Sequence, residues 1–141
     1  SKADLEKIIE NEKKFNIIID DGSHFSRHQI FTFQCLFKSL EENGIYIIED
    51  VMTSYWKFGN WDGAYVDDAE FKSTCVGYFL NLARYVNYDE FENNLDVSKE
   101  EEEIVRSIGS IFFEKNLIII EKSKRTRGTP SVSRLKGFVS T

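Results

Sequence analysis

Apolar and polar residues follow one another along this chain in blocks that predict helices and strands in turn. Residues 3–14 place apolar side chains at helical spacing, with lysine and glutamate elsewhere, and predict a helix. Residues 15–19 read Phe-Asn-Ile-Ile-Ile, a run without alternation that predicts a strand buried on both faces. Residues 45–48 read Ile-Tyr-Ile-Ile and predict a second buried strand.

A helix is predicted between these two strands. Ser26 stands where it would begin, and Gln29 follows three residues later, as in a capping box. Asn43-Gly44 is expected to end the helix in the left-handed conformation. Its apolar stripe consists of Ile30, Phe33, Phe37 and Leu40. The order helix, strand, helix, strand indicates an α/β fold with parallel strands joined by crossover helices.

The following segment begins with an unusual loop at residues 51–66, which is rich in Trp, Tyr and Gly. Loops this long are often functional. Asp67 or Asp68 is expected to cap one long helix, whose apolar side carries Phe71, Cys75, Phe79, Leu82 and Val86. Residues 87–103 are polar and acidic, and predict a solvated surface.

The chain closes with an expected hairpin and a tail. Apolar runs at 110–113 and 117–121 are separated by three residues and predict two antiparallel strands. Residues 1–122 are therefore expected to form one α/β domain, and residues 123–141 a mobile, basic tail. The tail holds no acid, and its basic residues are Lys124, Arg125, Arg127, Arg134 and Lys136.

Composition narrows the class of protein. The chain has 141 residues, of which 41% are hydrophobic, and this indicates a single folded domain with a core. Its net charge of -6 argues against a nucleic-acid surface spread over the domain. The two cysteines, Cys35 and Cys75, lack metal-type spacing and are expected to be reduced, core-facing thiols of a cytoplasmic protein. No signal peptide or membrane span is expected.

Acidic residues follow both predicted buried strands. Asp20 and Asp21 end the first strand, and Glu49 and Asp50 end the second. Neighbouring parallel strands bring their carboxyl ends to one edge of a sheet, where α/β proteins bind ligands. Converging carboxylates need a cation, and their hard oxygens suit Mg²⁺, Ca²⁺ or Mn²⁺. Ordinary strand-end and capping acids are the alternative.

Strand geometry separates the roles of adjacent acids. Neighbouring residues in a strand point to opposite faces, so Glu49 and Asp50 can share an ion only if the strand has ended there. By the same reasoning Asp21, which is nearer the loop, is favoured for the metal. Asp20 is assigned a structural role or a role on the side of a cosubstrate.

Two histidines follow Asp21. At the mouth of such a site, His24 could take a proton from a substrate hydroxyl, which a nearby metal would make easier to remove. His28 lies four residues later, but a zinc site is not favoured because no third nitrogen or sulfur ligand is apparent. His28 is instead expected to be a surface or hydrogen-bonding residue.

The aromatic residues of the long loop are candidates for a substrate pocket. Tyr55, Trp56 and Trp61 offer flat apolar faces, which suit sugar rings. A loop that packs only on itself is the alternative reading.

These motifs together resemble the class I S-adenosylmethionine-dependent methyltransferases. More narrowly, they are similar to the metal-dependent macrolide sugar O-methyltransferases of the macrocin and mycinamicin type, and to the related cephalosporin-hydroxylase-like group. The matching segments are 15–24, with the residues around His28 and Phe33, then 44–50 and 53–56. The resemblance is strong over residues 1–66 and looser over 110–122.

The resemblance implies roles for the candidate residues. Asp21, Glu49 and Asp50 match the Mg²⁺ ligands and His24 matches the general base. Tyr55 and Trp56 would lie near the acceptor pocket. The implied reaction is transfer of the methyl group of S-adenosylmethionine to a hydroxyl of a sugar or glycosylated metabolite.

The resemblance also implies that the chain is the C-terminal half of a doubly wound methyltransferase sheet. The glycine-rich loop that holds the cosubstrate has no counterpart among these residues. The strand at 15–19 would normally be central, so one of its edges would be bare here. Bare apolar edges recruit partners. We therefore expect this edge to pair with a missing N-terminal half or with a second copy of the chain.

Two other kinds of function remain open on the sequence alone. One is a metal-dependent hydrolase or hydroxylase-like protein that uses the same acids without S-adenosylmethionine. The other is a non-catalytic, methyltransferase-like module.

Overall fold

The computed structural model of the chain describes residues 2–10, 13–88 and 98–123, and the statements below concern those residues. Residues 124–141 of the predicted tail, and residues 89–97 of the polar segment at 87–103, lie outside them. The helices are α1 (Lys2–Glu10), α2 (Ser26–Leu36), α3 (Cys75–Ala83) and α4 (Lys99–Arg106). The strands are β1 (Phe15–Asp20), β2 (Leu40–Glu49), β3 (Ile108–Glu114) and β4 (Leu117–Lys122). Three short 3₁₀ helices are η1 (Phe37–Ser39), η2 (Val51–Tyr55) and η3 (Ala69–Ser73).

The strands form one mixed sheet in the order β1-β2-β4-β3. β1 and β2 are parallel, whereas β4 runs antiparallel to both β2 and β3. The α/β class and the antiparallel closing hairpin predicted from the sequence are therefore confirmed. β1 is an edge strand among the described residues.

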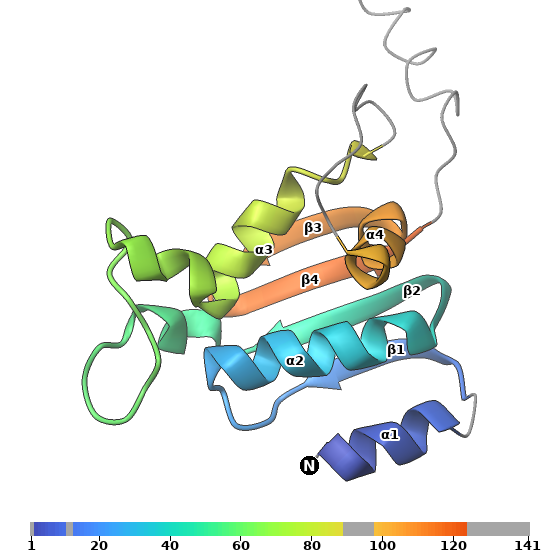
Figure 1. Cartoon of the computed structure of the whole chain (residues 1–141), viewed down its shortest axis with the longest axis horizontal. Helices are drawn as coiled ribbons and strands as arrows, with labels where there is room; N and C mark the ends of the chain where they lie inside the picture. The colour runs from blue at the N-terminus through green and yellow to red at the C-terminus, as the bar shows by residue number, and fades with distance from the viewer. Residues whose placement is uncertain (1, 11–12, 89–97, 124–141) are drawn as a thin grey trace, which may run out of the picture.

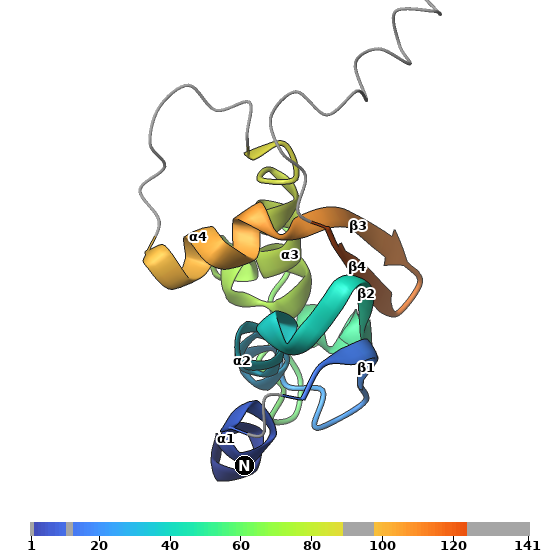
Figure 2. The ribbon, with the colours of Figure 1, turned by 90° about the vertical axis from the view of Figure 1, so that its right-hand side faces the viewer.

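The helices α2, α3 and α4 lie on one face of the sheet (Figures 1 and 2). The core lies between these two layers because alternate strand side chains point toward the helices. On the sheet, Tyr46, Ile48, Ile118 and Ile120 are fully buried, and Phe33 of α2 and Phe79 of α3 cover them.

The prediction that β1 is buried on both faces is wrong for the described part of the chain. Ile17 is 57% exposed and Ile19 is 56% exposed, because no described helix covers the face of the sheet to which they point. In β2, by contrast, Tyr46 and Ile48 are buried toward the helices. The described structure thus holds one of the two helical layers that a doubly wound sheet carries.

The ends of α2 differ from the prediction. The helix begins at Ser26 with Phe25 as its N-cap residue and without a side-chain cap, so Ser26 and Gln29 do not form a capping box. It ends at Leu36, where η1 leads directly into β2. Asn43 does adopt the left-handed conformation (φ 63°), but inside β2 rather than at the end of a helix.

The long helix predicted after residue 67 is divided in two. Phe71 lies in η3, and α3 begins only at Cys75 with the Thr74 side chain accepting a hydrogen bond from the Gly77 amide. Gly77 allows the two pieces to pack closely, since a Cβ atom there would lie 1.9 Å from the Phe71 carbonyl oxygen. An unbroken apolar stripe in the sequence does not show this break.

The acidic run near residue 100 forms a helix that the sequence reading did not predict. α4 begins with a capping box, in which Ser98 and Glu101 each bond the other's backbone amide. Ile104 and Val105 are buried, while most of the acidic side chains are exposed as expected. No described helix is long and apolar enough to cross a membrane.

Neither cysteine forms a disulfide. Cys75 is fully buried, and burial raises the pKa of its thiol far above the ordinary value. Cys35 is only partly buried and packs against the core.

Candidate metal and catalytic site

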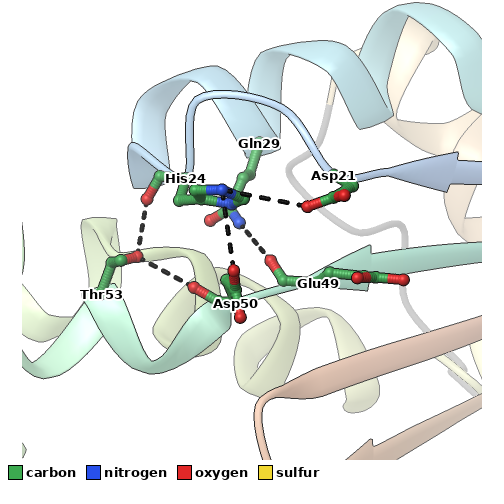
Figure 3. Close-up of polar contacts among 6 residues, drawn as sticks. All are labelled: Asp21, His24, Gln29, Glu49, Asp50 and Thr53. Carbon is green, nitrogen blue, oxygen red and sulfur yellow. Dashed lines mark hydrogen bonds and ion pairs between the residues drawn. The ribbon is translucent and has the colours of Figure 1, made fainter.

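Three predicted site residues meet at the carboxyl ends of β1 and β2. Asp21, His24 and Asp50 each place one potential ligand atom within 4.8 Å of the others. The Nε2 atom of His24 lies 3.9 Å from Asp21 Oδ1 and 3.7 Å from Asp50 Oδ2 (Figure 3). The histidine ring therefore lies between the two carboxylates, one from each strand end.

The backbone explains how Asp50 reaches this cluster. β2 ends at Glu49, and Asp50 adopts the left-handed conformation with φ 55° and ψ 41°. His24 is also left-handed, with φ 56°. Non-glycine residues in this region carry a strain of about 1 kcal/mol or more and are enriched at functional sites. The turn at Asp50 frees its side chain from strand alternation.

Glu49 contributes differently from Asp50 in this structure. Its carboxylate is not in the group formed by Asp21, His24 and Asp50. Its backbone oxygen accepts a hydrogen bond from Gln29 Nε2 at 2.9 Å. The assignment of Glu49 as a metal ligand stays a prediction.

The donor set of the cluster fits a small divalent cation. Two carboxylates from separate loops and one imidazole converge, and Asp21 is exposed while His24 and Asp50 are partly buried. Carboxylate oxygens suit Mg²⁺ or Mn²⁺, which also bind through substrate and water oxygens. Asp21 and Asp50 are the residues of this set that would hold such an ion.

Asp20 lies apart from this cluster, on the helix-covered face of the sheet. It pairs in register with Ile48, and its Oδ2 atom is buried without a hydrogen-bond partner. Burial raises the pKa of the Asp20 carboxyl above its ordinary value, against the opposing effects of the Gly22 amide and His24. The two acids of this strand end thus have separate environments, as the alternation argument predicted.

His28 takes no part in the cluster. It is exposed, and its Nδ1 atom is 2.7 Å from Ser23 Oγ. The prediction that His28 is a surface, hydrogen-bonding residue is confirmed.

The aromatic loop forms a chain of ring contacts that reaches the residue after His24. Trp56 contacts Phe58 at 5.3 Å and Trp61 at 5.7 Å between ring centroids, and Trp61 contacts Phe25 at 5.1 Å. Tyr55 packs instead on Phe71, at 5.5 Å. Of the two residues that the resemblance places near the acceptor pocket, Trp56 is therefore the one whose ring belongs to this chain of contacts.

Two residues that hold the site together were not identified from the sequence. Asp62 accepts hydrogen bonds from the backbone amides of Ser26 and Arg27, at 2.9 and 3.2 Å, and so caps α2 from a distant loop. Thr53 donates from Oγ1 to the backbone oxygen of His24 at 2.6 Å. Both contacts span about 30 residues of sequence or more, and no local motif indicates them.

The chain is similar to known proteins over most of its length. The chain is 34% identical over 134 residues to 8-demethyl-8-alpha-L-rhamnosyl tetracenomycin-C 2'-O-methyltransferase of Streptomyces olivaceus. This match covers 95% of this chain and 33% of that protein. It is 29% identical to mycinamicin VI 2''-O-methyltransferase of Micromonospora griseorubida, over 88% of this chain and 30% of that protein. No family model matches the chain.

A solved structure has the same fold. The MycE methyltransferase from the mycinamycin biosynthetic pathway, in complex with Mg, SAH and mycinamycin VI, superposes with a TM-score of 0.69 and 26% identity. The match covers 89% of this chain and 30% of that one. The chain thus spans about a third of the length of the relatives it matches.

Proposed function

This chain is homologous, over most of its length, to part of the sugar O-methyltransferases, and we propose that it supplies the metal and proton-transfer site of an Mg²⁺-dependent methyltransferase that uses S-adenosylmethionine. The acceptor is a hydroxyl of a sugar or a glycosylated metabolite. The observation that carries the proposal is the convergence of Asp21, His24 and Asp50 within 4.8 Å at the ends of two parallel strands. Two cysteines that form no disulfide fit the reducing cytoplasm, which is the proposed place of action.

In this proposal Asp21 and Asp50 hold the cation, with Glu49 as a further ligand. A bound Mg²⁺ ion supplies positive charge that lowers the pKa of a nearby hydroxyl. His24 takes the hydroxyl proton on Nε2, which faces the two carboxylates. The acceptor oxygen then forms a bond to the methyl carbon as the carbon–sulfur bond of the sulfonium breaks, and the sulfur keeps that electron pair.

The acceptor is proposed to lie against the aromatic loop. Tyr55 ends η2 and Trp56 follows it, and the rings of Trp56, Trp61 and Phe25 form a chain of contacts that ends at the residue after His24. Aromatic faces bind sugar rings and other flat apolar surfaces. Asp20, which is partly buried, is proposed to act on the cosubstrate side of the same strand end.

Calorimetry with S-adenosylmethionine, in the presence and absence of Mg²⁺, tests the proposal. Binding of the cosubstrate together with Mg²⁺ is the expected result. Binding of Mg²⁺ alone would favour a metal-dependent hydrolase or hydroxylase-like protein that uses the same acids. Binding of neither would indicate a non-catalytic module and would contradict the proposal.

A partner for β1 belongs to the same proposal. β1 is at the edge of the described sheet, and two of its isoleucines are more than half exposed. Apolar strand edges of this kind pair with other chains. The partner is proposed to be further methyltransferase polypeptide, such as the part of the relatives that this chain does not match, or a second copy of the chain.

A further inference from the structure

Two buried side chains outside the set of ligands connect the two segments that carry it. Thr53 lies in η2, just after Asp50, and is 1% exposed. Gln29 lies in α2, after His24, and is 2% exposed. Neither residue can reach bulk solvent, so their polar atoms act within the protein.

These two side chains make hydrogen bonds in opposite directions between the segments (Figure 3). Thr53 Oγ1, on the β2 side, donates to the backbone oxygen of His24 at 2.6 Å. Gln29 Nε2, on the β1 side, donates to the backbone oxygen of Glu49 at 2.9 Å. We call Thr53, Gln29 and these two hydrogen bonds the clasp.

Thr53 also links the two strained backbones of the site. Its Oγ1 atom is 3.3 Å from the backbone oxygen of Asp50 as well as 2.6 Å from that of His24. His24 and Asp50 have φ values of 56° and 55°, and strained residues of this kind persist only where their surroundings hold them. One hydroxyl group therefore contacts both residues whose conformation directs a side chain into the cluster.

We propose that Thr53 and Gln29 are positioning residues, and that the clasp sets the spacing between His24 and Asp50. The clasp binds backbone oxygens, so it positions the backbone that carries the His24 and Asp50 side chains and does not contact the ion or the acceptor. Its role in metal binding rests on the proposed function, whereas its role in the geometry of the metal-free protein does not. Outer residues that orient metal ligands often change affinity by about 10-fold to 100-fold when replaced.

The test compares Thr53→Val, which has nearly the same shape but no hydroxyl donor, with Thr53→Ser, which keeps the donor. Two quantities are measured on the full 141-residue chain. The first is amide hydrogen exchange at residues 22–25 and 49–51 in the metal-free protein. The second is Mg²⁺ affinity by calorimetry, under conditions in which circular dichroism shows each variant to be folded.

Thr74 provides a matched control. It is also 1% exposed, and its hydroxyl bonds Phe71 and Gly77 rather than the site. Thr74→Val should lower stability without changing exchange at the site or Mg²⁺ affinity. Gln29→Met removes the second bond of the clasp and serves as the test if Thr53→Val does not fold.

Thr53→Val is expected to speed exchange at both segments and to weaken Mg²⁺ binding by about 10-fold, and Thr53→Ser should restore both. Unchanged exchange and affinity in Thr53→Val would overturn the proposal. Faster exchange with unchanged affinity would also overturn it, as would an equal loss of affinity in Thr74→Val. If the wild-type chain binds no Mg²⁺, faster exchange in Thr53→Val would still support the clasp, while the proposed metal site would fail.

Discussion

At the scale of single residues, the site depends on two side chains whose backbones are left-handed. The candidate residues of the site could be identified from the sequence, because acids that follow buried strands and a histidine that precedes a helix form a recognisable pattern. It could not predict that Asp50 turns into the cluster while the carboxylate of Glu49 stays outside it, since a φ value of 55° at Asp50 depends on tertiary contacts. Strand geometry required the strand to end before Asp50, and the structure shows that β2 does end at Glu49.

His24→Asn tests the proposed base without disturbing the backbone. Asparagine tolerates the left-handed conformation better than alanine does, so the fold should be retained. Methyl transfer is expected to fall by about 100-fold or more, because the general base is lost. Mg²⁺ affinity, measured by calorimetry on the same sample, should stay nearly constant.

Two results would contradict that assignment. An unchanged rate of methyl transfer in His24→Asn would remove His24 from the mechanism. A large loss of Mg²⁺ affinity would instead make His24 a metal ligand, which its position between Asp21 and Asp50 permits.

At the scale of elements, α2 is positioned by a loop that is distant in the sequence. Its first amides are bound by Asp62 rather than by a local capping box, although Ser26 and Gln29 have the spacing of one. The Gln29 side chain instead donates a hydrogen bond to the backbone oxygen of Glu49. The start of α2 could thus be predicted from the sequence, but the residue that caps it could not, because it lies 36 residues away.

Asp62→Ala should destabilise the protein by about 1 kcal/mol, the usual effect of losing an N-terminal cap. Urea denaturation measures this change, and faster exchange of the Ser26 and Arg27 amides would locate it. Asp67→Ala is the matched control, since Asp67 is an exposed acid just after the same loop and should have little effect. Equal stability of the two variants would show that Asp62 does not cap α2.

At the scale of the whole molecule, the sheet has one face covered by helices and one face without them (Figure 2). A row of apolar side chains crosses all four strands on the uncovered face: Ile19, Ile47, Ile119 and Phe112 are neighbours in register. Parallel strands are usually covered on both faces. The positions of β1 and β2 could be predicted from the sequence, but the prediction that β1 is buried on both faces is wrong for the described residues, where Ile17 and Ile19 are more than half exposed.

The chain is expected to self-associate through this region when no other polypeptide covers it. Sedimentation measured over a range of concentrations should show oligomers, and Ile17→Lys with Ile19→Lys should reduce them by placing charge on the apolar strand. Leu80→Lys, at an exposed apolar position of α3, is the control and should leave association unchanged. A wild-type chain that stays monomeric at every concentration would contradict the proposed pairing of β1.

Calorimetric titration of Mg²⁺ into the wild-type chain and into Asp50→Asn tests the metal site most directly. Asparagine adopts the left-handed conformation about as readily as aspartate does, but it lacks the negative charge of the carboxylate. We predict one Mg²⁺ ion per wild-type chain, an affinity at least about 10-fold weaker in Asp50→Asn, and no change in a Glu41→Gln control at an exposed acid of β2. No binding by the wild type, or equal affinity in wild type and Asp50→Asn, would contradict the site at the ends of β1 and β2.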